Sequence, residues 1–419
     1  MGKNAKNCQI IPPPKKRSER LGNHEIEPLT LFLYVLVFYL TFLMTVVLMN
    51  RGSDFTAHTE LALETVRFSQ PLHVFEYLSY PIWHILVAGV YRFFRHPVYS
   101  AAFVSASFNL FTTAVIYRVL KRFLSDKFSA NHICFITFIL TFVTAIWIPW
   151  FSPHIYLGPL SPTIWHNPTN NAVKGISIII FYLFIDIFLN AQKAEKDRMP
   201  MKQMALLSFL LLISTLLKPS FIILFIPAAF LFLLIELIRV KGKNIVFCMQ
   251  TALACLPSLI PLFYSYYLTY IKLQSDLRGG VVFSFLTAIS TWTTNIPLTV
   301  MLPFIFPMFV IMLNYKNIYQ NKPLFFAMMT AFVGALYWLC FAESNQLHAN
   351  ELAWVQILAL ILIWLVTIID FFSIYHRDRH SGNRLRKNLI SMGFVLVFMH
   401  FFTGIYYYIR LLFFAAGQC

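Results

Sequence analysis

Long apolar stretches alternate with short polar segments along almost the whole chain. A helix of about 20 apolar residues spans the hydrocarbon core of a bilayer and satisfies its own backbone hydrogen bonds. The pattern therefore predicts an all-α, polytopic helical membrane protein with about 11 transmembrane helices. The predicted spans are 28–50, 98–118, 133–150, 170–190, 204–217, 221–239, 245–271, 297–314, 323–341, 353–375 and 388–410.

The stretch 71–94 is also apolar, but histidines, a glutamate and a proline interrupt it. If it does not cross the membrane, most of the 33 Lys and Arg residues fall in loops on one side, which the positive-inside rule makes cytoplasmic. The pattern thus predicts a basic cytoplasmic tail over 1–27 and one transmembrane domain over 28–419. Residues 51–97 become the first external loop, with a helix lying at or dipping into the membrane interface.

The composition of the chain agrees with this architecture. Hydrophobic residues make up 58% of it and charged residues 12%, against about 25% charged in a soluble protein. The net charge of +16 is explained by cytoplasmic loops and contact with lipid rather than by nucleic-acid binding, because no base-reading motif is present. The six cysteines have no metal-ligand spacing, so no metal site is predicted. The first apolar run is too long for a signal peptide and is expected to remain as an anchor.

The predicted topology gathers unusual polar residues at the external face, beginning directly after the first span. In the run Arg51-Gly-Ser-Asp-Phe-Thr-Ala-His58, Asp54 and His58 share one helix face at i, i+4 spacing. A carboxylate at the edge of a low-dielectric site suits a general base. The alternative interpretation of Asp54 is a solvated carboxylate just beyond the end of a span.

Lys218 stands beside Pro219 between two apolar runs, near the external edge of the hydrocarbon core. A lysine at this depth is costly unless its side chain reaches the surface or meets an anion. Lys218 is therefore either an anchor or a point charge for a phosphate.

Two further external segments, 157–171 and 343–354, carry hydrogen-bonding and aromatic side chains. The loop 157–171 contains Trp165, His166 and Asn167, and Lys174 follows in the next span. Tryptophan stacking combined with Asn and His hydrogen bonds suits a sugar, but Trp is equally common in the interfacial belt of membrane proteins. Further candidates for substrate binding are His84, Arg278, Glu343 and His348.

The signature motifs of several other enzyme classes are missing from the sequence, which contains no Walker motif, GxSxG, HExxH or DxD. Besides Lys174, the charges inside the predicted spans are Asp186, Glu236 and Asp370, all nearer the cytoplasmic side. So few intramembrane charges argue against an ion-coupled transporter.

The order of these features matches that of a known family. An acidic residue follows the first span in Ser53-Asp54-Phe55, and a Pro-aromatic interfacial segment comes next, Tyr80-Pro-Ile-Trp-His-Ile-Leu86. A later span ends in Ser152-Pro153, and a hairpin contains Ser214-Thr-Leu-Leu-Lys-Pro-Ser220. Over roughly 28–240 the chain resembles the GT-C superfamily of polytopic glycosyltransferases, such as protein O-mannosyltransferases and aminoarabinose transferases.

The resemblance implies an inverting glycosyltransferase of the plasma (inner) membrane. It would move a sugar from a polyprenyl-phosphate donor to an acceptor on the external face, without a nucleotide cofactor. Asp54 would be the general base, and Lys218, with Arg278 or Lys174, would stabilise the departing phosphate. His58 and the loop 165–171 would orient the sugar.

Other classes of membrane protein remain as alternatives, namely a polysaccharide repeat-unit polymerase or exporter, a translocase of lipid-linked glycans, and a membrane component without catalysis. The sequence leaves open whether a divalent metal is required and whether the protein forms oligomers. Glycosyl transfer requires Asp54 and Lys218 to lie within about 10–15 Å of one another in one external site, close enough for their charges to act on the same phosphosugar. The distance between Asp54 and Lys218 therefore distinguishes a glycosyltransferase from the alternative classes.

Overall fold

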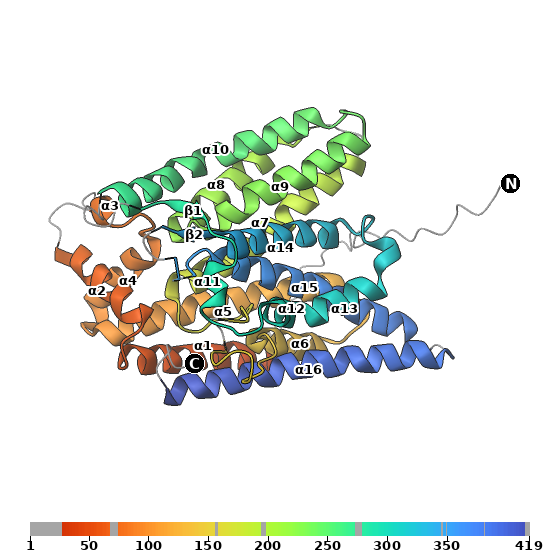
Figure 1. The fold of residues 1–419 in the computed structure, drawn as a ribbon, viewed down its shortest axis with the longest axis horizontal. Coiled ribbons are helices and arrows are strands. Elements are labelled where there is room, and N and C mark those ends of the chain that lie inside the picture. Colours follow the sequence, from red (N-terminus) through yellow and green to blue (C-terminus); the bar gives the residue numbers. More distant parts are fainter. Residues whose placement is uncertain are drawn as a thin grey trace.

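The computed structural model describes residues 27–67, 74–155, 158–193, 198–272, 279–344, 347–348, 350–380 and 382–414. Most of these residues belong to a bundle of long helices that run roughly side by side (Figure 1). The expected all-α, polytopic fold is therefore confirmed.

Within the described residues, nine helical segments are long and apolar enough to cross a membrane. They coincide with nine of the predicted spans. In chain order they are α1 (Pro28–Met49), α5 (Pro97–Leu124), α7 (Pro168–Lys193), α9 (Ser220–Arg239), α10 (Ile245–Tyr267) with its π-helical continuation η2 (Leu268–Lys272), α12 (Ile296–Met301) continuing through η3 (Leu302–Phe304) into α13 (Ile305–Leu313), α14 (Lys322–Cys340), α15 (Ala353–Asp378) and α16 (Arg384–Phe413).

The two remaining predicted spans are shorter helices, α6 (Ala130–Phe142) and α8 (Met201–Leu217), of 13 and 17 residues. The predicted span 133–150 extends beyond the helix, because α6 ends at Phe142. A contact with α16 replaces the next turn, as the imidazole Nδ1 of His400 lies 2.5 Å from the carbonyl oxygen of Thr144. Gly404 permits this approach, since a Cβ there would lie 1.5 Å from the carbonyl oxygen of Phe142.

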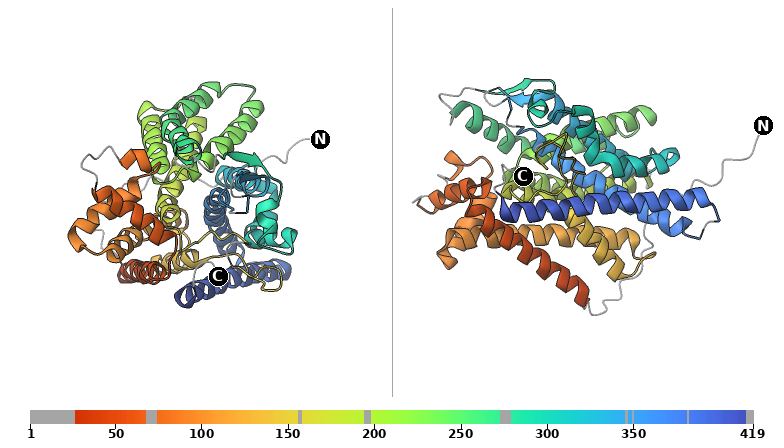
Figure 2. Two further views of the ribbon diagram at one scale, coloured as in Figure 1. Left: turned by 60° about the vertical axis from the view of Figure 1, so that its left-hand side comes forward. Right: turned by 60° about the horizontal axis from the view of Figure 1, so that its bottom comes forward.

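Helix α15 forms the centre of the bundle. In its most apolar window 94% of the residues are buried, against 33% in α1, α10 and α16, which lie toward the outside (Figure 2). Helix α14 packs closely along α15 because Gly334 has no side chain. A Cβ at Gly334 would lie 3.0 Å from the Cα of Gln356.

Short elements gather at one end of the bundle, on the left in Figure 1. We call this the loop-rich end. It comprises α2 (Asp54–Arg67), α3 (Val74–Tyr77), α4 (Ile82–Phe94), the loop 158–167, α11 (Thr287–Ser290), and the antiparallel strands β1 (Val281–Phe283) and β2 (Phe341–Glu343). Helix α4 has 13 residues and packs on α2 and α5. It is too short to cross a bilayer, which agrees with the prediction that 71–94 is not a span.

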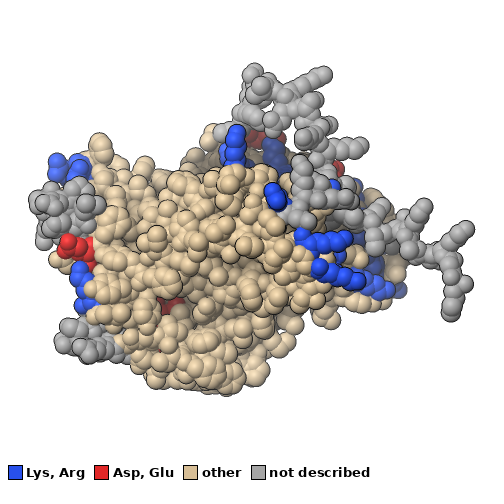
Figure 3. Space-filling model, turned by 90° about the horizontal axis from the view of Figure 1, so that it is seen from above, with Lys and Arg blue, Asp and Glu red and all other residues tan. Residues whose placement is uncertain are grey.

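The opposite end, which we call the basic end, carries the clusters 118–127, 239–243 and 377–387. On the face shown in Figure 3, a broad area without Lys or Arg separates the basic side chains on the right from a smaller charged group on the left. An apolar zone between two charged ends is the arrangement expected of a multi-pass membrane protein. Helix ends alternate between the two ends as the predicted topology requires.

The acidic residues inside the spans are all bound near the basic end. Asp186 pairs with Arg122, with nitrogen–oxygen distances of 2.5 and 2.7 Å. Asp370 accepts a hydrogen bond of 2.7 Å from Asn321. Glu236 pairs with Lys322 at 2.5 Å and with Arg239 at 2.9 Å. Except for Glu236–Arg239, which lies within α9, these contacts join different helices, and all of them lie away from the polar side chains at the loop-rich end.

Candidate functional site

Three side chains from distant parts of the sequence meet at the loop-rich end. The amide nitrogen Nδ2 of Asn167 donates a hydrogen bond of 2.9 Å to Oδ2 of Asp54. On its other side the amide oxygen Oδ1 accepts one of 3.3 Å from the ammonium of Lys218. A single amide group therefore separates the acid from the amine, which meets the separation required by the sequence analysis. We call these three residues the Asp–Asn–Lys cluster.

The position of Asp54 follows from a turn after α1. Gly52 has φ of +69°, a left-handed conformation that glycine adopts without strain, and the chain turns here into α2. Asp54 is the first residue of α2, where a carboxylate is favoured by the positive end of the helix dipole. Its side chain is exposed, so it remains accessible to a hydroxyl group arriving from solvent.

Asn167 is held in one orientation because it caps α7. Its Oδ1 accepts a hydrogen bond of 2.9 Å from the backbone N–H of Asn170 and another of 3.2 Å from the hydroxyl of Thr169. Pro168 follows as the first helical residue, a position that suits its fixed φ. Because Oδ1 faces these donors and Lys218, Nδ2 must face Asp54.

Lys218 lies at the tip of the hairpin between α8 and α9. Its backbone is extended, with φ of −165° and ψ of 130°, as expected for a residue before proline, and α8 ends there. The side chain is only 8% exposed, and its ammonium lies 4.6 Å from the ring centroid of Trp354 and 3.4 Å from the hydroxyl of Thr169. Burial lowers the pKa of Lys218 to about 8, against the opposing effect of the negative charges of Glu351 and Asp54.

His58 and His84 form a pair beside the cluster. Nδ1 of His58 lies 3.0 Å from Nε2 of His84, so one ring donates to the other. Burial lowers the pKa of His58 to about 3, assisted by the charges of His84 and Lys218, and burial lowers that of His84 to about 4. Both rings are neutral at pH 7, and they can orient a hydroxyl group but contribute no charge.

His166 borders the cluster from the other side. Its Nδ1 lies 3.0 Å from the hydroxyl of Tyr407 in α16, and its ring lies 5.9 Å from that of Trp354. Burial lowers the pKa of His166, and the charges of Lys218 and Lys174 act in the same direction while that of Asp54 opposes them. His166 therefore lies within electrostatic reach of both charged members of the cluster.

Two other predicted site residues, Trp165 and Lys174, lie away from the Asp–Asn–Lys cluster. Trp165 is 2% exposed and packs on Phe142 and Tyr408, at ring distances of 5.5 and 5.0 Å, inside the bundle. Lys174 lines a separate pocket with Trp165, on the α5 side of α7. Neither side chain contacts Asp54 or Lys218 in the described part of the chain.

Glu343, at the end of β2, accepts a hydrogen bond from the hydroxyl of Tyr270. His348 lies against Thr291, with 2.8 Å between its Nδ1 and the hydroxyl oxygen. Arg278 lies outside the residues that the structure describes.

Four residues around the cluster were not predicted individually as site residues, although each lies in a segment that the sequence analysis had singled out: Thr169, Trp354, Glu351 and Tyr80. Trp354 covers Lys218, and its indole N–H donates a hydrogen bond of 2.9 Å to Glu351. Burial raises the pKa of Tyr80 to about 12, and the charges of Glu351, Asp54 and Glu343 add to this shift. The signal available for Glu351 and Trp354 was their place in the last external segment, next to Glu343 and His348.

Among the described residues, no group of three or more His, Cys, Asp or Glu side chains is placed to hold a metal ion. No model of a known protein family matches the chain, and no curated protein matches it significantly in sequence. The functional interpretation therefore depends on the geometry of the site.

Proposed function

We propose that the protein is a membrane glycosyltransferase that moves a sugar from a polyprenyl-phosphate donor to an acceptor hydroxyl at the loop-rich end. One observation carries this proposal. An exposed carboxylate and a buried ammonium, 164 positions apart in sequence, both contact the amide of Asn167. A base and a cation held close to one another are what inverting transfer from a phosphosugar requires.

In the proposed reaction, Asp54 accepts the proton of the acceptor hydroxyl. The hydroxyl oxygen forms a bond to the anomeric carbon while the bond from that carbon to the phosphate oxygen breaks. The electron pair leaves with the phosphate, and the positive charge of Lys218 stabilises the negative charge that develops there. Attack from the side opposite the phosphate inverts the anomeric centre.

The surroundings of Lys218 support its role as an anion ligand. Its neighbours are an amide, a hydroxyl and an aromatic ring, and no carboxylate forms an ion pair with it among the described residues. The charge is thus desolvated but not neutralised. In such a setting its attraction for a phosphate is stronger than at an exposed site.

The neutral imidazoles of His58 and His84 and the amide of Asn167, the residue that caps α7, provide hydrogen-bonding groups suited to sugar hydroxyls. Trp354 and Tyr80 add aromatic surface beside them. The apolar zone of the bundle would accommodate the polyprenyl chain, so donor and cluster would meet where the membrane borders the loop-rich end. The external position of that end and the plasma (inner) membrane location belong to the proposal.

The test is transfer by the purified full chain, using a panel of polyprenyl-phosphate sugars with release of polyprenyl phosphate as readout. We expect Asp54→Asn and Lys218→Met each to reduce transfer at least about 100-fold, the scale of losing a general base or a charge-stabilising group. Matched controls are Glu60→Gln, an exposed acid on the same helix α2, and Lys202→Met, an exposed lysine at the start of α8. Full activity of the folded Asp54→Asn variant would overturn the base assignment.

Movement of a labelled lipid-linked glycan across the membrane of vesicles that contain the protein, without release of polyprenyl phosphate, would instead favour a translocase.

A further inference from the structure

The end of α16 binds the chain just before Asp54. The last carbonyls of a helix lack an N–H partner within the helix. At this end the guanidinium of Arg51 supplies the missing donors. Its Nη1 lies 3.1 Å from the carbonyl oxygens of Leu411 and Phe414, and its Nη2 donates to that of Leu412. A cation is also favoured by the negative end of the helix dipole, so Arg51 fastens the turn after α1 to the end of α16.

The turn that follows Arg51 is short and closed by its own hydrogen bonds. The hydroxyl of Thr56 accepts one of 3.2 Å from the backbone N–H of Ser53 and donates one of 3.3 Å to the carbonyl of Met49. Asp54 begins α2 within this turn, three positions after Arg51. The contact between Arg51 and α16 therefore restricts where the carboxylate of Asp54 can lie.

The same end of α16 contacts the chain just before Asn167. The hydroxyl of Tyr407 lies 3.0 Å from Nδ1 of His166, and both side chains are buried. Tyr407 and Leu411 are four positions apart, so they lie on one face of the helix, one turn from each other. His166 and Arg51 are therefore held by neighbouring turns of one helix.

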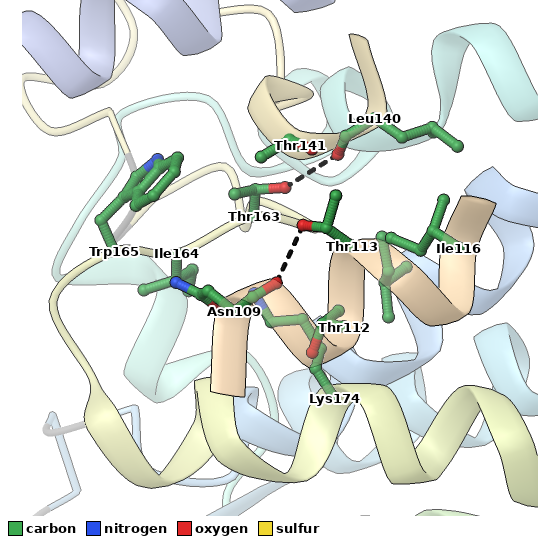
Figure 4. A pocket seen from close by; sticks show the side chains of 11 residues that line it. Asn109, Thr112, Thr113, Ile116, Leu140, Thr141, Thr163, Ile164, Trp165 and Lys174 are labelled. Atoms are coloured by element: carbon green, nitrogen blue, oxygen red, sulfur yellow. Dashed lines mark hydrogen bonds between the residues drawn. The ribbon is translucent and has the colours of Figure 1, made fainter. Parts of the chain in front are cut away.

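Helix α6 holds the earlier part of the same loop. Figure 4 shows the hydroxyl of Thr163 pointing to α6, where it donates a hydrogen bond of 3.3 Å to the carbonyl of Leu140. Trp165 packs on Phe142 of the same helix, with 5.5 Å between the ring centroids. These contacts fix the start of the loop, whereas Tyr407 holds its end.

The contacts join into a closed ring. One path runs from α16 through Arg51 to Asp54, and the other runs through Tyr407 and His166 to Asn167. The two paths meet in the hydrogen bond of 2.9 Å between Asn167 and Asp54. A closed ring fixes the relative position of two groups, because neither can move without breaking a contact or displacing the other.

We propose that residues 407–414, which we call the α16 brace, set the position of Asp54 relative to Asn167. Arg51 and Tyr407 are the positioning residues, and neither takes part in the chemistry. The consequence for transfer rests on the proposed function, whereas the brace itself does not.

The first test needs no sugar donor. It measures hydrogen–deuterium exchange of backbone amides in the detergent-purified full chain. Tyr407→Phe removes one hydroxyl and keeps the ring, and we expect the amides of 165–171 to exchange several-fold faster, because the loop opens locally more often. The matched control is Tyr408→Phe, which removes the next hydroxyl along the helix, bound to the carbonyl of Leu40 in α1 at 2.8 Å. It should leave 165–171 at the wild-type rate.

The other arm of the ring is tested in the same way. Arg51→Met should speed exchange over 51–58 several-fold. Because Arg51 is exposed, its removal leaves no buried charge behind, and the variant should fold. The control is Arg92→Met, since Arg92 is an exposed arginine on α4, at the same end of the bundle.

The second test is transfer by the folded variants. Arg51→Met and Tyr407→Phe should each lower kcat about 10-fold with KM nearly unchanged, because the base is displaced while Lys218 still binds the phosphate. The double variant should lose little more than either single variant, since one broken arm already opens the ring. Two independent structural contacts would instead multiply to about 100-fold.

Exchange at the wild-type rate over 165–171 in Tyr407→Phe, or over 51–58 in Arg51→Met, would overturn the brace. Multiplying losses in the double variant, or wild-type kcat in both single variants, would overturn it too. If exchange responds as expected but the wild-type protein releases polyprenyl phosphate from no donor, the brace stands and the proposed function fails.

Discussion

Asn167 has two structural tasks that belong to different parts of its amide. Its oxygen caps α7 and meets Lys218, and its nitrogen meets Asp54. An N-cap accounts for about 1 kcal/mol of stability, and serine replaces asparagine well in that task. Serine is too short to bridge the carboxylate and the ammonium. The two tasks can therefore be separated by mutation.

We expect Asn167→Ser to leave the free energy of unfolding within about 0.5 kcal/mol of wild type, since the cap is preserved. Its glycosyl transfer should nevertheless fall at least about 10-fold, because Asp54 and Lys218 lose their common positioning contact. The measurement is kcat/KM alongside thermal unfolding, with Asn167→Ala as the control that loses both tasks. Wild-type transfer by Asn167→Ser would show that the bridge is not needed.

The pKa of Lys218 predicts how transfer depends on pH. Burial lowers this pKa to about 8, and the protonated form is the one that attracts phosphate. Transfer should therefore be lost as pH rises through about 8, not through the ordinary lysine value above 10. The ring of Trp354 favours the charged form, so Trp354→Leu should move the alkaline limb of the kcat/KM profile to lower pH. An alkaline limb that remains at the same pH in Trp354→Leu would contradict this assignment.

Sequence reasoning reached some of these residues and not others. Asp54 and Lys218 stood out because a charge at the end of an apolar run is unusual wherever the chain folds. The bridging role of Asn167 and the position of Trp354 over Lys218 depend on how side chains from distant segments pack. No local pattern contains that information.

At the scale of elements, the buried network around Glu236 joins α9 to α14. The carboxylate is fully buried and paired with Lys322, which is also buried, while Arg239 is half exposed. Breaking such a pair leaves a charge without its partner inside the protein, which is far more costly than losing an exposed pair.

Lys322→Met should lower the free energy of unfolding by about 3 kcal/mol, at the low end for buried pairs because Arg239 remains. The double variant Glu236→Leu, Lys322→Met should recover most of the loss, since it leaves no unpaired charge. Thermal unfolding in detergent measures both. Arg377→Met is the control, because the side chain of Arg377 is exposed and Asp378 keeps its second partner, Arg386, so the loss should stay below about 1 kcal/mol. Equal losses in the buried and exposed variants would contradict the prediction.

Hydropathy predicted the positions of the long helices well, because the apolar character of a segment depends only on the residues of that segment. Nine predicted spans coincide with long helices, and 71–94 contains no helix of spanning length. The end of α6 was not predicted, because it depends on residues that are distant in the sequence. Val143 to Trp150 is apolar enough to continue the helix, but His400 and Gly404, more than 250 positions away, determine where it stops.

At the scale of the whole molecule, the positive-inside rule predicts that the basic end of the bundle faces the cytoplasm. The proposed reaction needs the loop-rich end outside. We expect a membrane-impermeant thiol reagent to label Glu60→Cys in intact cells and to label Lys202→Cys only after the membrane is opened. Both positions are exposed, and they lie at opposite ends of the bundle. Labelling of both positions from the same side would contradict the topology, and labelling with the sides exchanged would place the cluster in the cytoplasm.

The central place of α15 has a consequence for how the protein is made. This helix begins at Ala353, so the ribosome completes every earlier helix before the one that fills their middle. Until then the inner faces of α7, α9 and α14 lack their partner and must be shielded by lipid, by the insertion machinery or by one another. Biogenesis therefore includes a late step in which α15 enters the interior of an almost complete bundle, and only α16 is added after it.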